Sequence, residues 1–354
     1  MENSDNKTAQ TGLVDRLRRY GVAPVAVLGA FAAFAGALFR SGSAPKPAAN
    51  KPALPASPPR PASTQTGPRS TPVKLEREYV RTATLGGAVS SHPIRRSLNG
   101  VAVGPADRIY LLGDGEVRIF EAGGEFSGAW KAPERAACIH VTSEGLVYLG
   151  AQDRLAIYDL KGNPMGGFSA GESGNPAVIT AIKVVRNEIL VADSDSRCIR
   201  RYDSQGRELG RIGTQNKTGS FMLPNRWLDF DVDSRGVIHA TDSGRHRVSS
   251  WALDGSPLGG FGKFGMSHPA DFVGCCNPVN LAVSPDGEIV TGEKMVARVK
   301  VYEPAGKLVA LMGPDNFDQQ CTHIYLAVDS KRRILAGDPV RREVVIFSFK
   351  NQGT

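Results

Sequence analysis

The sequence predicts an all-β protein built from six copies of one unit, and three observations on residues 77–349 lead to this prediction. A valine that ends an apolar run recurs at a period of roughly forty-five residues. An aromatic residue lies seventeen to nineteen positions after each valine. An apolar residue of the second strand lies six or seven positions after the same valine, except in unit four, where His239 occupies this position. The pairs are Val103 and Phe120, Val141 and Tyr158, Val184 and Tyr202, Val232 and Trp251, Val283 and Tyr302, and Val328 and Phe347. All-β repeats of this length typically form four-stranded sheets around an axis, so we expect a six-bladed β-propeller.

The fifth unit shows how each repeat is expected to fold. An apolar run ends at Val283, a Pro-Asp-Gly turn follows at residues 285–287, and a second run includes Ile289 and Val290. Alternating apolar residues then lead to Tyr302, which gives three short strands joined by tight turns.

A fourth strand is expected after each of the first five aromatic residues. These strands cover residues 126–130, 165–168, 208–212, 257–261 and 307–312. The sixth unit ends near Phe349 without one, and an unpaired strand edge invites aggregation. The strand-like segment Glu78–Gly87 is therefore predicted to close the ring as the outer strand of the sixth blade.

Units four and five carry a resemblance to a known repeat. Unit four runs from Val232 through Asp242, Arg247 and Trp251, and residues 281–302 are similar. Both resemble the NHL repeat, which implies a six-bladed NHL-like propeller over residues 77–349. Units one and two lack the acidic residue that ends the second strand, and unit three has Cys198 where the other two have arginine.

The chain before the repeats is expected to divide into three segments. Residues 20–39 form an uncharged apolar run long enough to span a bilayer, and arginines concentrate before it. Residues 1–19 would then be cytoplasmic, residues 20–39 a transmembrane helix, and residues 40–76 a disordered Pro/Ala-rich linker to an extracytoplasmic propeller. A cleaved signal peptide is the alternative, which would give a secreted protein, because Ala33-Phe34-Ala35 fits a cleavage site. Residues 350–354 are a short C-terminal tail.

The charge distribution argues against nucleic-acid binding. The formal net charge is +8 over 354 residues. Residues 1–73 carry nine Lys or Arg against three acids, which leaves about +2 for the remainder.

One end of each blade gathers the charged residues that could bind a ligand. Adjacent strands in a blade run antiparallel, so the end of the second strand and the start of the third meet there. The residues at these positions are Asp193, Asp242, Glu293 and Asp338, with Arg247 and Arg298 opposite. They are predicted to bind a ligand or, alternatively, to pair with one another and cap the loops.

The second candidate site is a cysteine cluster. Cys276 and Cys321 occupy the same repeat position in blades five and six, Cys275 is adjacent, and His323 lies two residues beyond Cys321. In an exported protein, a disulfide between Cys321 and either Cys275 or Cys276 is expected. The alternatives are a metal or iron–sulfur site, or thiols that only pack the inner strands; packing is the preferred interpretation for Cys138 and Cys198.

The predicted function is that of a membrane-tethered binding module for a protein or peptide. The first alternative is a redox or metal-binding protein that uses Cys275, Cys276 and Cys321. The second, a metal-dependent lyase or hydrolase, rests on resemblance, because some lyases with NHL-like propellers hold zinc on histidines around the central channel. No catalytic motif with the expected structural context is present, so no catalytic residue is assigned, and the sequence leans against an enzyme.

Overall fold

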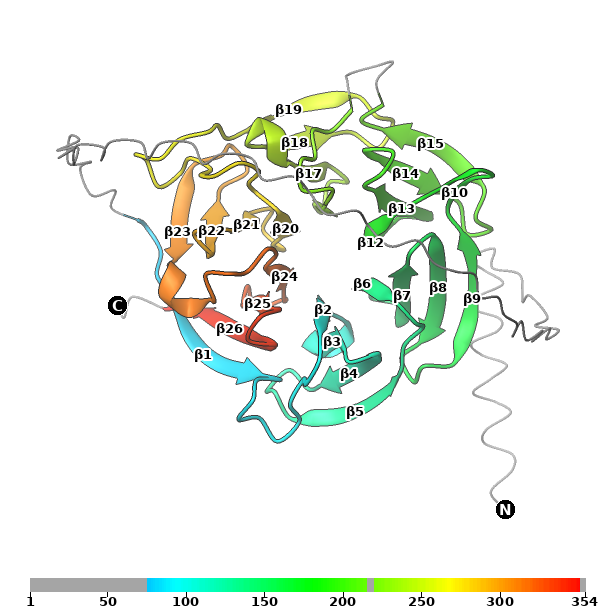
Figure 1. Cartoon of the computed structure of the whole chain (residues 1–354), viewed down its shortest axis with the longest axis horizontal. Helices are drawn as coiled ribbons and strands as arrows, with labels where there is room; N and C mark the ends of the chain where they lie inside the picture. Colours follow the sequence, from blue (N-terminus) through cyan, green and yellow to red (C-terminus); the bar gives the residue numbers. More distant parts are fainter. Residues whose placement is uncertain (1–74, 215–219, 351–354) are drawn as a thin grey trace, which may run out of the picture. The chain divides into compact units, whose positions relative to one another are not determined.

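Six four-stranded antiparallel sheets surround one axis in the computed structural model, which describes residues 75–214 and 220–350 (Figure 1). The prediction of a six-bladed all-β propeller is confirmed. The predicted segments 1–19 and 20–39 and almost all of the linker lie outside the described residues. Within the described residues, no helix is long and apolar enough to span a membrane.

Blades one to five each use four consecutive strands. Blade one holds β2 (Leu98–Val103), β3 (Ile109–Gly113), β4 (Glu116–Phe120) and β5 (Phe126–Lys131), and blade two holds β6 (Ala136–Val141), β7 (Leu146–Ala151), β8 (Arg154–Asp159) and β9 (Pro164–Ser169). Blade three holds β12 (Ile179–Val185), β13 (Glu188–Asp193), β14 (Cys198–Tyr202) and β15 (Glu208–Ile212). Blade four holds β16 (Phe230–Val232), β17 (Ile238–Asp242), β18 (Arg247–Trp251) and β19 (Pro257–Phe261), and blade five holds β20 (Asn280–Val283), β21 (Ile289–Glu293), β22 (Arg298–Tyr302) and β23 (Leu308–Met312).

The sixth blade closes the ring as predicted. Its inner strands are β24 (Tyr325–Val328), β25 (Ile334–Asp338) and β26 (Glu343–Phe349), and its outer strand is β1 (Tyr79–Leu85). The β1 and β26 strands pair antiparallel from Tyr79 opposite Phe349 to Leu85 opposite Val344. The first described strand thus supplies the hydrogen-bonding edge that the last unit lacks.

The repeated apolar residues build the core between neighbouring blades. Val301 of blade five shares one cluster of buried side chains with Ala336 of blade six, and Leu335 of blade six shares another with Leu111 of blade one. His239, the exception to the apolar pattern, is buried because its Nδ1 pairs with Ser250 Oγ at 2.9 Å. A single blade cannot bury both of its faces alone, so the buried apolar side chains form clusters between neighbouring blades.

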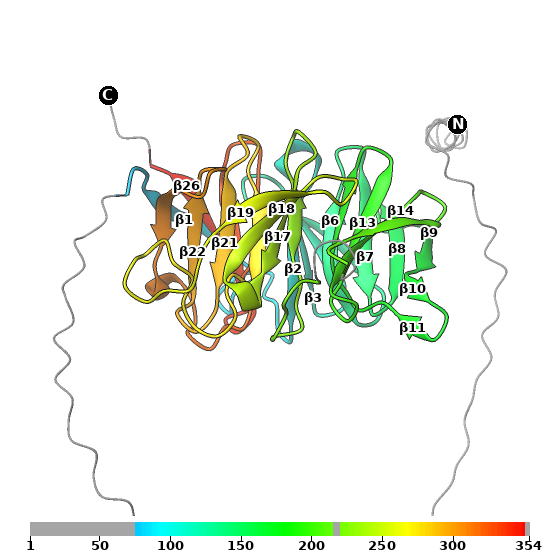
Figure 2. The same cartoon turned by 90° about the horizontal axis from the view of Figure 1, so that it is seen from above.

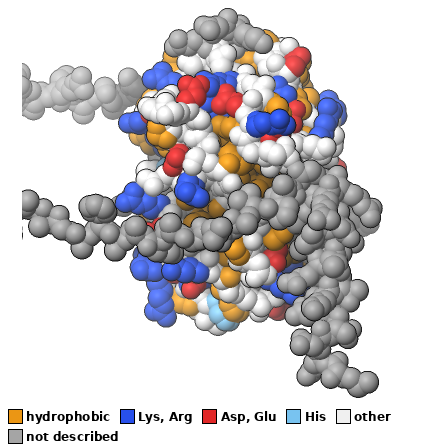
Figure 3. Space-filling view, turned by 90° about the vertical axis from the view of Figure 1, so that its right-hand side faces the viewer, with side chains coloured by type: hydrophobic (Ala, Val, Ile, Leu, Met, Phe, Trp, Pro, Cys, Tyr) orange, Lys and Arg blue, Asp and Glu red, His pale blue; other side chains and the backbone are white. Residues whose placement is uncertain are grey.

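The two ends of the blades differ, and we name them by their connections. The loop face carries the loops that enter each blade and the turns between second and third strands; the turn face carries the remaining short turns. The small hairpin of β10 (Gly171–Glu172) and β11 (Asn175–Pro176) lies on the loop face, at the lower edge of Figure 2. Single 3-10 turns occur at η1 (Pro105–Asp107), η2 (Ser243–Arg245) and η3 (Pro314–Asn316). Figure 3 looks onto the outer rim, where basic, acidic and apolar side chains are interspersed.

Candidate functional site

The four predicted carboxylates lie on the loop face and hold the loops that enter their own blades. Each accepts a backbone N–H from that loop. The pairs are Asp193 with Val178 at 3.1 Å, Asp242 with Met222 at 2.8 Å, Glu293 with Val273 at 3.3 Å, and Asp338 with Asp318 at 2.7 Å. All four residues are buried. The geometry matches the loop-capping alternative, and each carboxylate already has partners within the protein.

In blade one, the entering loop is also held by a carboxylate, but this residue was not predicted from the repeat pattern. Asp114 follows the end of β3 and accepts the N–H groups of Arg95, Arg96 and Ser97 at 2.8, 2.6 and 3.0 Å. These hydrogen bonds outweigh the effect of burial and hold the pKa of Asp114 below its ordinary value. In blade two the equivalent residue is Ala151, and there the entering loop is only residues 132–135. A short loop needs no such anchor.

Two of the carboxylates also neutralise fully buried cations. Arg200 in blade three donates to Asp193 at 2.8 Å and to Glu208 at 2.8 Å, while the ammonium of Lys300 in blade five lies 2.5 Å from Glu293. Burial alone would raise the pKa of Asp193, but hydrogen bonds from Ser196 and Arg200 outweigh it and lower that pKa. Burial also lowers the pKa of Lys300 to about 8, against the opposing effect of Glu293.

This basic position was not among the predicted site residues, although it recurs in the repeats. Arg200, Lys300 and Arg118 all stand two residues before the third-strand aromatic of their repeat. Arg118 pairs with Asp114 at 3.1 Å, so blades one, three and five share a carboxylate–cation pair.

The two predicted arginines have different partners. Arg298 pairs with Glu293 at 3.1 Å, which fits the pairing alternative. In blade four, however, Arg245 rather than Arg247 reaches Asp242, at 2.8 Å. The reason is the η2 turn, which brings Arg245 back over the end of β17. Arg247 has a buried Nε without a hydrogen-bond partner in the described residues.

The expected disulfide of Cys321 is not formed. All five cysteines lie within the described residues and all are free. The Cys321 thiol donates to Asp338 Oδ1 at 3.0 Å, whereas the Sγ atoms of Cys275 and Cys276 contact each other at 3.1 Å. Cys276 and Cys321 therefore occupy the same repeat position, but their side chains contact different residues. Cys138 and Cys198 are buried, as the packing interpretation requires.

The cysteine cluster does not fit a metal ion or an iron–sulfur cluster. Cys321 faces the carboxylate of Asp338, and His323 packs its ring against Trp227 at 4.2 Å between centroids. Burial, aided by the positive charge of Lys294, lowers the pKa of His323 to about 4. Across residues 75–214 and 220–350, no group of three His, Cys, Asp or Glu side chains is placed to hold a metal.

A polar cavity on the propeller axis was not predicted. Its volume is about 130 Å³, and residues of all six inner strands line it. Lys183 and Asp231 form an ion pair at 2.9 Å in this lining. Asp229, just before β16, accepts hydrogen bonds from Asn280 Nδ2 at 2.9 Å and from the N–H of Leu281 at 3.1 Å. The alternation of Asp229 and Asp231 in an otherwise apolar strand was the available sequence signal.

Burial dominates the titration of groups around this cavity. It raises the pKa of Asp229 to about 6, although hydrogen bonds and Lys183 act in the opposite direction. It lowers the pKa of His140 to about 3, with Lys183 acting in the same direction. His140 is therefore neutral at neutral pH.

Exposed apolar side chains concentrate on the loop face. This face carries eight of the twelve large hydrophobic side chains that are exposed in the described residues. They are Val89, Val178, Met222, Phe264, Met266, Met295, Val296 and Val340. Five of these, Met222, Phe264, Met266, Met295 and Val296, lie on the loops of blades four and five, and we call them the methionine patch.

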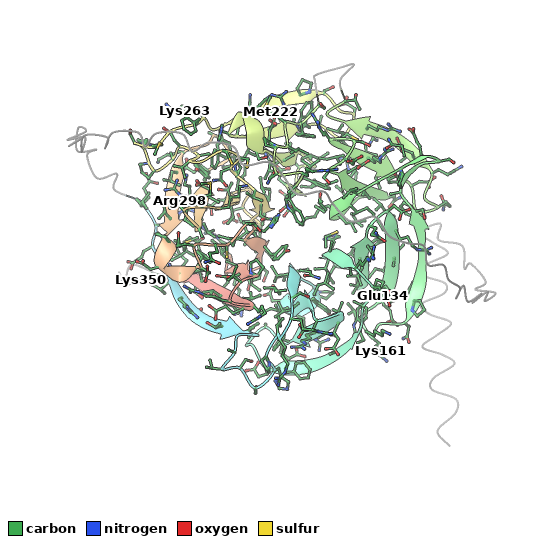
Figure 4. All side chains as sticks on the ribbon, viewed as in Figure 1. Glu134, Lys161, Met222, Lys263, Arg298 and Lys350 are labelled. Atoms are coloured by element: carbon green, nitrogen blue, oxygen red, sulfur yellow. The ribbon has the colours of Figure 1, made fainter. Side chains whose placement is uncertain are left out.

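Three members of the methionine patch contact residues of the same loops. Met222 packs on Gly244, two residues before His246, whose ring lies 5.1 Å from that of Phe264. Met295 reaches Gly274 in the loop that enters blade five. Figure 4 labels Met222, Lys263 and Arg298 in these two blades.

Basic residues lie on the same loops as the methionine patch. Arg226, Arg245, Lys263 and Lys294 lie on the same loops. The carboxylate of Lys263's neighbour Asp271 is largely buried and 4.0 Å away, and Asp242, the partner of Arg245, is buried. The loops of blades four and five therefore carry both exposed apolar side chains and basic side chains.

Comparison with known proteins shows the fold. No family model and no curated protein matches the chain. Virginiamycin B lyase from Staphylococcus aureus is 11% identical with a TM-score of 0.51, covering 77% of this chain and 99% of that one. A chain of the mitotic checkpoint complex is 13% identical with a TM-score of 0.52, covering 81% and 97%; the WD40 β-propeller domain of Doa1 is 16% identical with a TM-score of 0.50, covering 72% and 79%.

The chain is a six-bladed β-propeller. At these identities the similarity extends to the fold alone, and the NHL resemblance stays a prediction.

Proposed function

We propose that this chain is a membrane-tethered, extracytoplasmic NHL-like propeller that binds a protein or peptide segment on its loop face. The methionine patch is the observation that carries the proposal. Met266 is 82% exposed and Met295 is 61% exposed, although an isolated soluble domain gains nothing by exposing such side chains together. Methionine adapts its shape to different apolar partners and is common at binding surfaces.

The predicted carboxylates act in this proposal as positioning residues. Asp242 holds the N–H of Met222, and Glu293 holds that of Val273 in the loop that also carries Phe264 and Met266. They fix the loops that present the patch, and they need not touch the partner. Arg298 supports Glu293 in this role.

The surrounding charge specifies the partner's chemistry. The Lys263 side chain is 77% exposed, so it can pair with a carboxylate brought by a partner, whereas Arg226, 79% exposed, already pairs with Asp195 at 2.8 Å. The ligand that fits is a segment whose apolar side chains cover the methionine patch and whose acidic residues pair with Lys263 and the other basic residues of these loops. Such complementarity speeds association and selects among partners.

Panning a random-peptide library on the folded protein tests this proposal. We expect enriched peptides to combine apolar and acidic residues, and to lose at least tenfold in affinity when Met266→Asp or Met295→Asp is introduced. Leu258→Asp is the matched control, because Leu258 is 56% exposed but lies on the outer strand β19. Failure to enrich any peptide, or binding that survives both patch substitutions, would refute the docking surface.

The tether requires a separate experiment. The uncharged run at residues 20–39 supports an anchor, and the Pro-rich segment after it supports a spacer. The full chain should remain in membranes after alkaline extraction, and a variant without residues 1–39 should be released. Protease added to intact cells should reach the propeller of the full chain. A released full chain with a shortened N-terminus would show signal cleavage instead.

A further inference from the structure

Cys275 and Cys276 form a pair that neither the fold nor the proposed docking surface requires. Their Sγ atoms are 3.1 Å apart, closer than heavy atoms in ordinary van der Waals contact at about 3.5–4.0 Å. Cys275 is exposed and Cys276 is buried. The pair therefore joins a residue that solvent reaches to one that the fold buries.

The surrounding loop holds this pair in place. The Asn277 side chain donates to the carbonyls of Val273 and Lys294 at 2.6 and 3.0 Å, and it accepts the N–H of Lys294 at 2.9 Å. Burial raises the pKa of the Cys276 thiol, and the Lys294 ammonium partly offsets this effect.

We propose that Cys275 and Cys276 are a redox-active dithiol that closes to a vicinal disulfide by exchange with a small organic disulfide. The Cys275 thiolate attacks one sulfur of the reagent R–S–S–R, which forms Cys275–S–S–R and releases RS⁻. The Cys276 thiolate then attacks the Cys275 sulfur and displaces the second RS⁻. The protein loses two protons and two electrons, and the reagent is reduced to two thiols.

The bond between these neighbours should be easy to reverse. Consecutive Cα atoms are about 3.8 Å apart. Ordinary disulfides join Cα atoms at about 4.4–6.8 Å, and deviation from that range stores strain and makes the bond more reducible. Strained and exposed disulfides are the labile ones. The pair is therefore a reversible redox site rather than a structural cross-link, and this holds whether or not the methionine patch binds a partner.

Equilibration of the folded protein in glutathione buffers, followed by acid trapping and tryptic digestion, tests the proposal. Cys275 and Cys276 share the tryptic peptide 264–294, and Cys321 lies in the peptide 308–331. In oxidised glutathione we expect peptide 264–294 to lack two hydrogen atoms and to carry no glutathione. Excess reduced glutathione should restore both thiols. As a second measurement, the reduced protein should bind one equivalent of phenylarsine oxide, a reagent for paired thiols.

Single variants separate the two steps. In Cys276→Ser, Cys275 should keep a glutathione adduct, because the thiol that resolves it is gone, and the arsenical should no longer bind. Cys198→Ser is the matched control and should leave both results unchanged. Three outcomes with the wild-type protein would overturn the proposal: persistent free thiols, a stable glutathione adduct, or a cross-link between peptides 264–294 and 308–331.

Discussion

The two ends of the blades are built from the same strands but are held in different ways. On the turn face, four aspartates cap their own turns by accepting the N–H groups two and four residues further on. These are Asp159, Asp203, Asp233 and Asp329. On the loop face, the carboxylates accept N–H groups that lie fifteen to twenty residues earlier in the chain, and Asp193 and Asp338 also accept N–H groups of their own turns.

The difference separates scaffold from recognition surface. A turn that closes on itself is specified by a few adjacent residues and leaves little room for variation. A loop that is held at one point by a distant carboxylate can change elsewhere along its length without losing its anchor. Exposed apolar side chains gather on the face with anchored loops, where they are free to meet a partner.

The largest effect is expected at the buried pair behind the loop face. Arg200→Ala leaves the buried Asp193 without its cation, while Glu208 keeps Arg211, and the loss should lower the free energy of unfolding by about 3–5 kcal/mol. Arg200→Lys should lose less, because blade five uses Lys300 at this position. Urea denaturation measures both. A loss below about 1 kcal/mol for the alanine variant would contradict the assigned role.

A loop-face anchor should matter more than a turn-face cap. Asp114→Ala removes the acceptor of three backbone N–H groups and should cost about 1–3 kcal/mol, while Asp203→Ala should cost about 1 kcal/mol. Hydrogen exchange should accelerate at Arg95, Arg96 and Ser97 in the first variant only. Equal costs in urea denaturation would remove the proposed distinction between the faces.

Local features of this arrangement could be predicted from the sequence, whereas side-chain contacts between distant residues could not. The valine–aromatic spacing and the turn at residues 285–287 are local patterns, so the strands and the ring closure by β1 could be predicted. The partner of Asp242 is a backbone N–H at Met222, in an entering loop that lies outside the repeated pattern of valines and aromatic residues. The contact between Cys321 and Asp338 could not be predicted, because a repeat alignment predicts backbone positions but not side-chain directions.

Opposite pH dependences should distinguish the axial carboxylate from the loop anchors. The pKa of Asp229 is raised to about 6 from an ordinary 3.8, so its ionisation disfavours the folded state, and its contribution to stability falls as pH rises from about 4 to about 6. In Asp229→Asn that fall should disappear. The lowered pKa values of Asp114 and Asp193 have the opposite sign, since their contribution is lost as pH falls below about 4. Stability that is independent of pH between 4 and 6 in the wild type would contradict the first statement.

The smallest effect is expected at an exposed pair on the turn face. Arg207 is 78% exposed and pairs with Asp203 at 2.6 Å. Arg207→Ala should change the free energy of unfolding by less than about 1 kcal/mol, and added salt should reduce even that difference. A larger loss would mean that charge on the turn face contributes as much as the buried pairs do.

The pairing of β1 with β26 determines when this protein can finish folding. Thr82 contacts Ile346 across 264 residues, so the first described strand must wait for nearly the whole propeller to be synthesised before its partner exists. Closing so long a loop is entropically costly, and contacts of such sequence separation form slowly. The first five blades can assemble during synthesis while the edge of β1 that pairs with β26 is still open. The nascent chain is therefore most vulnerable to misassembly in the interval just before its final strand emerges.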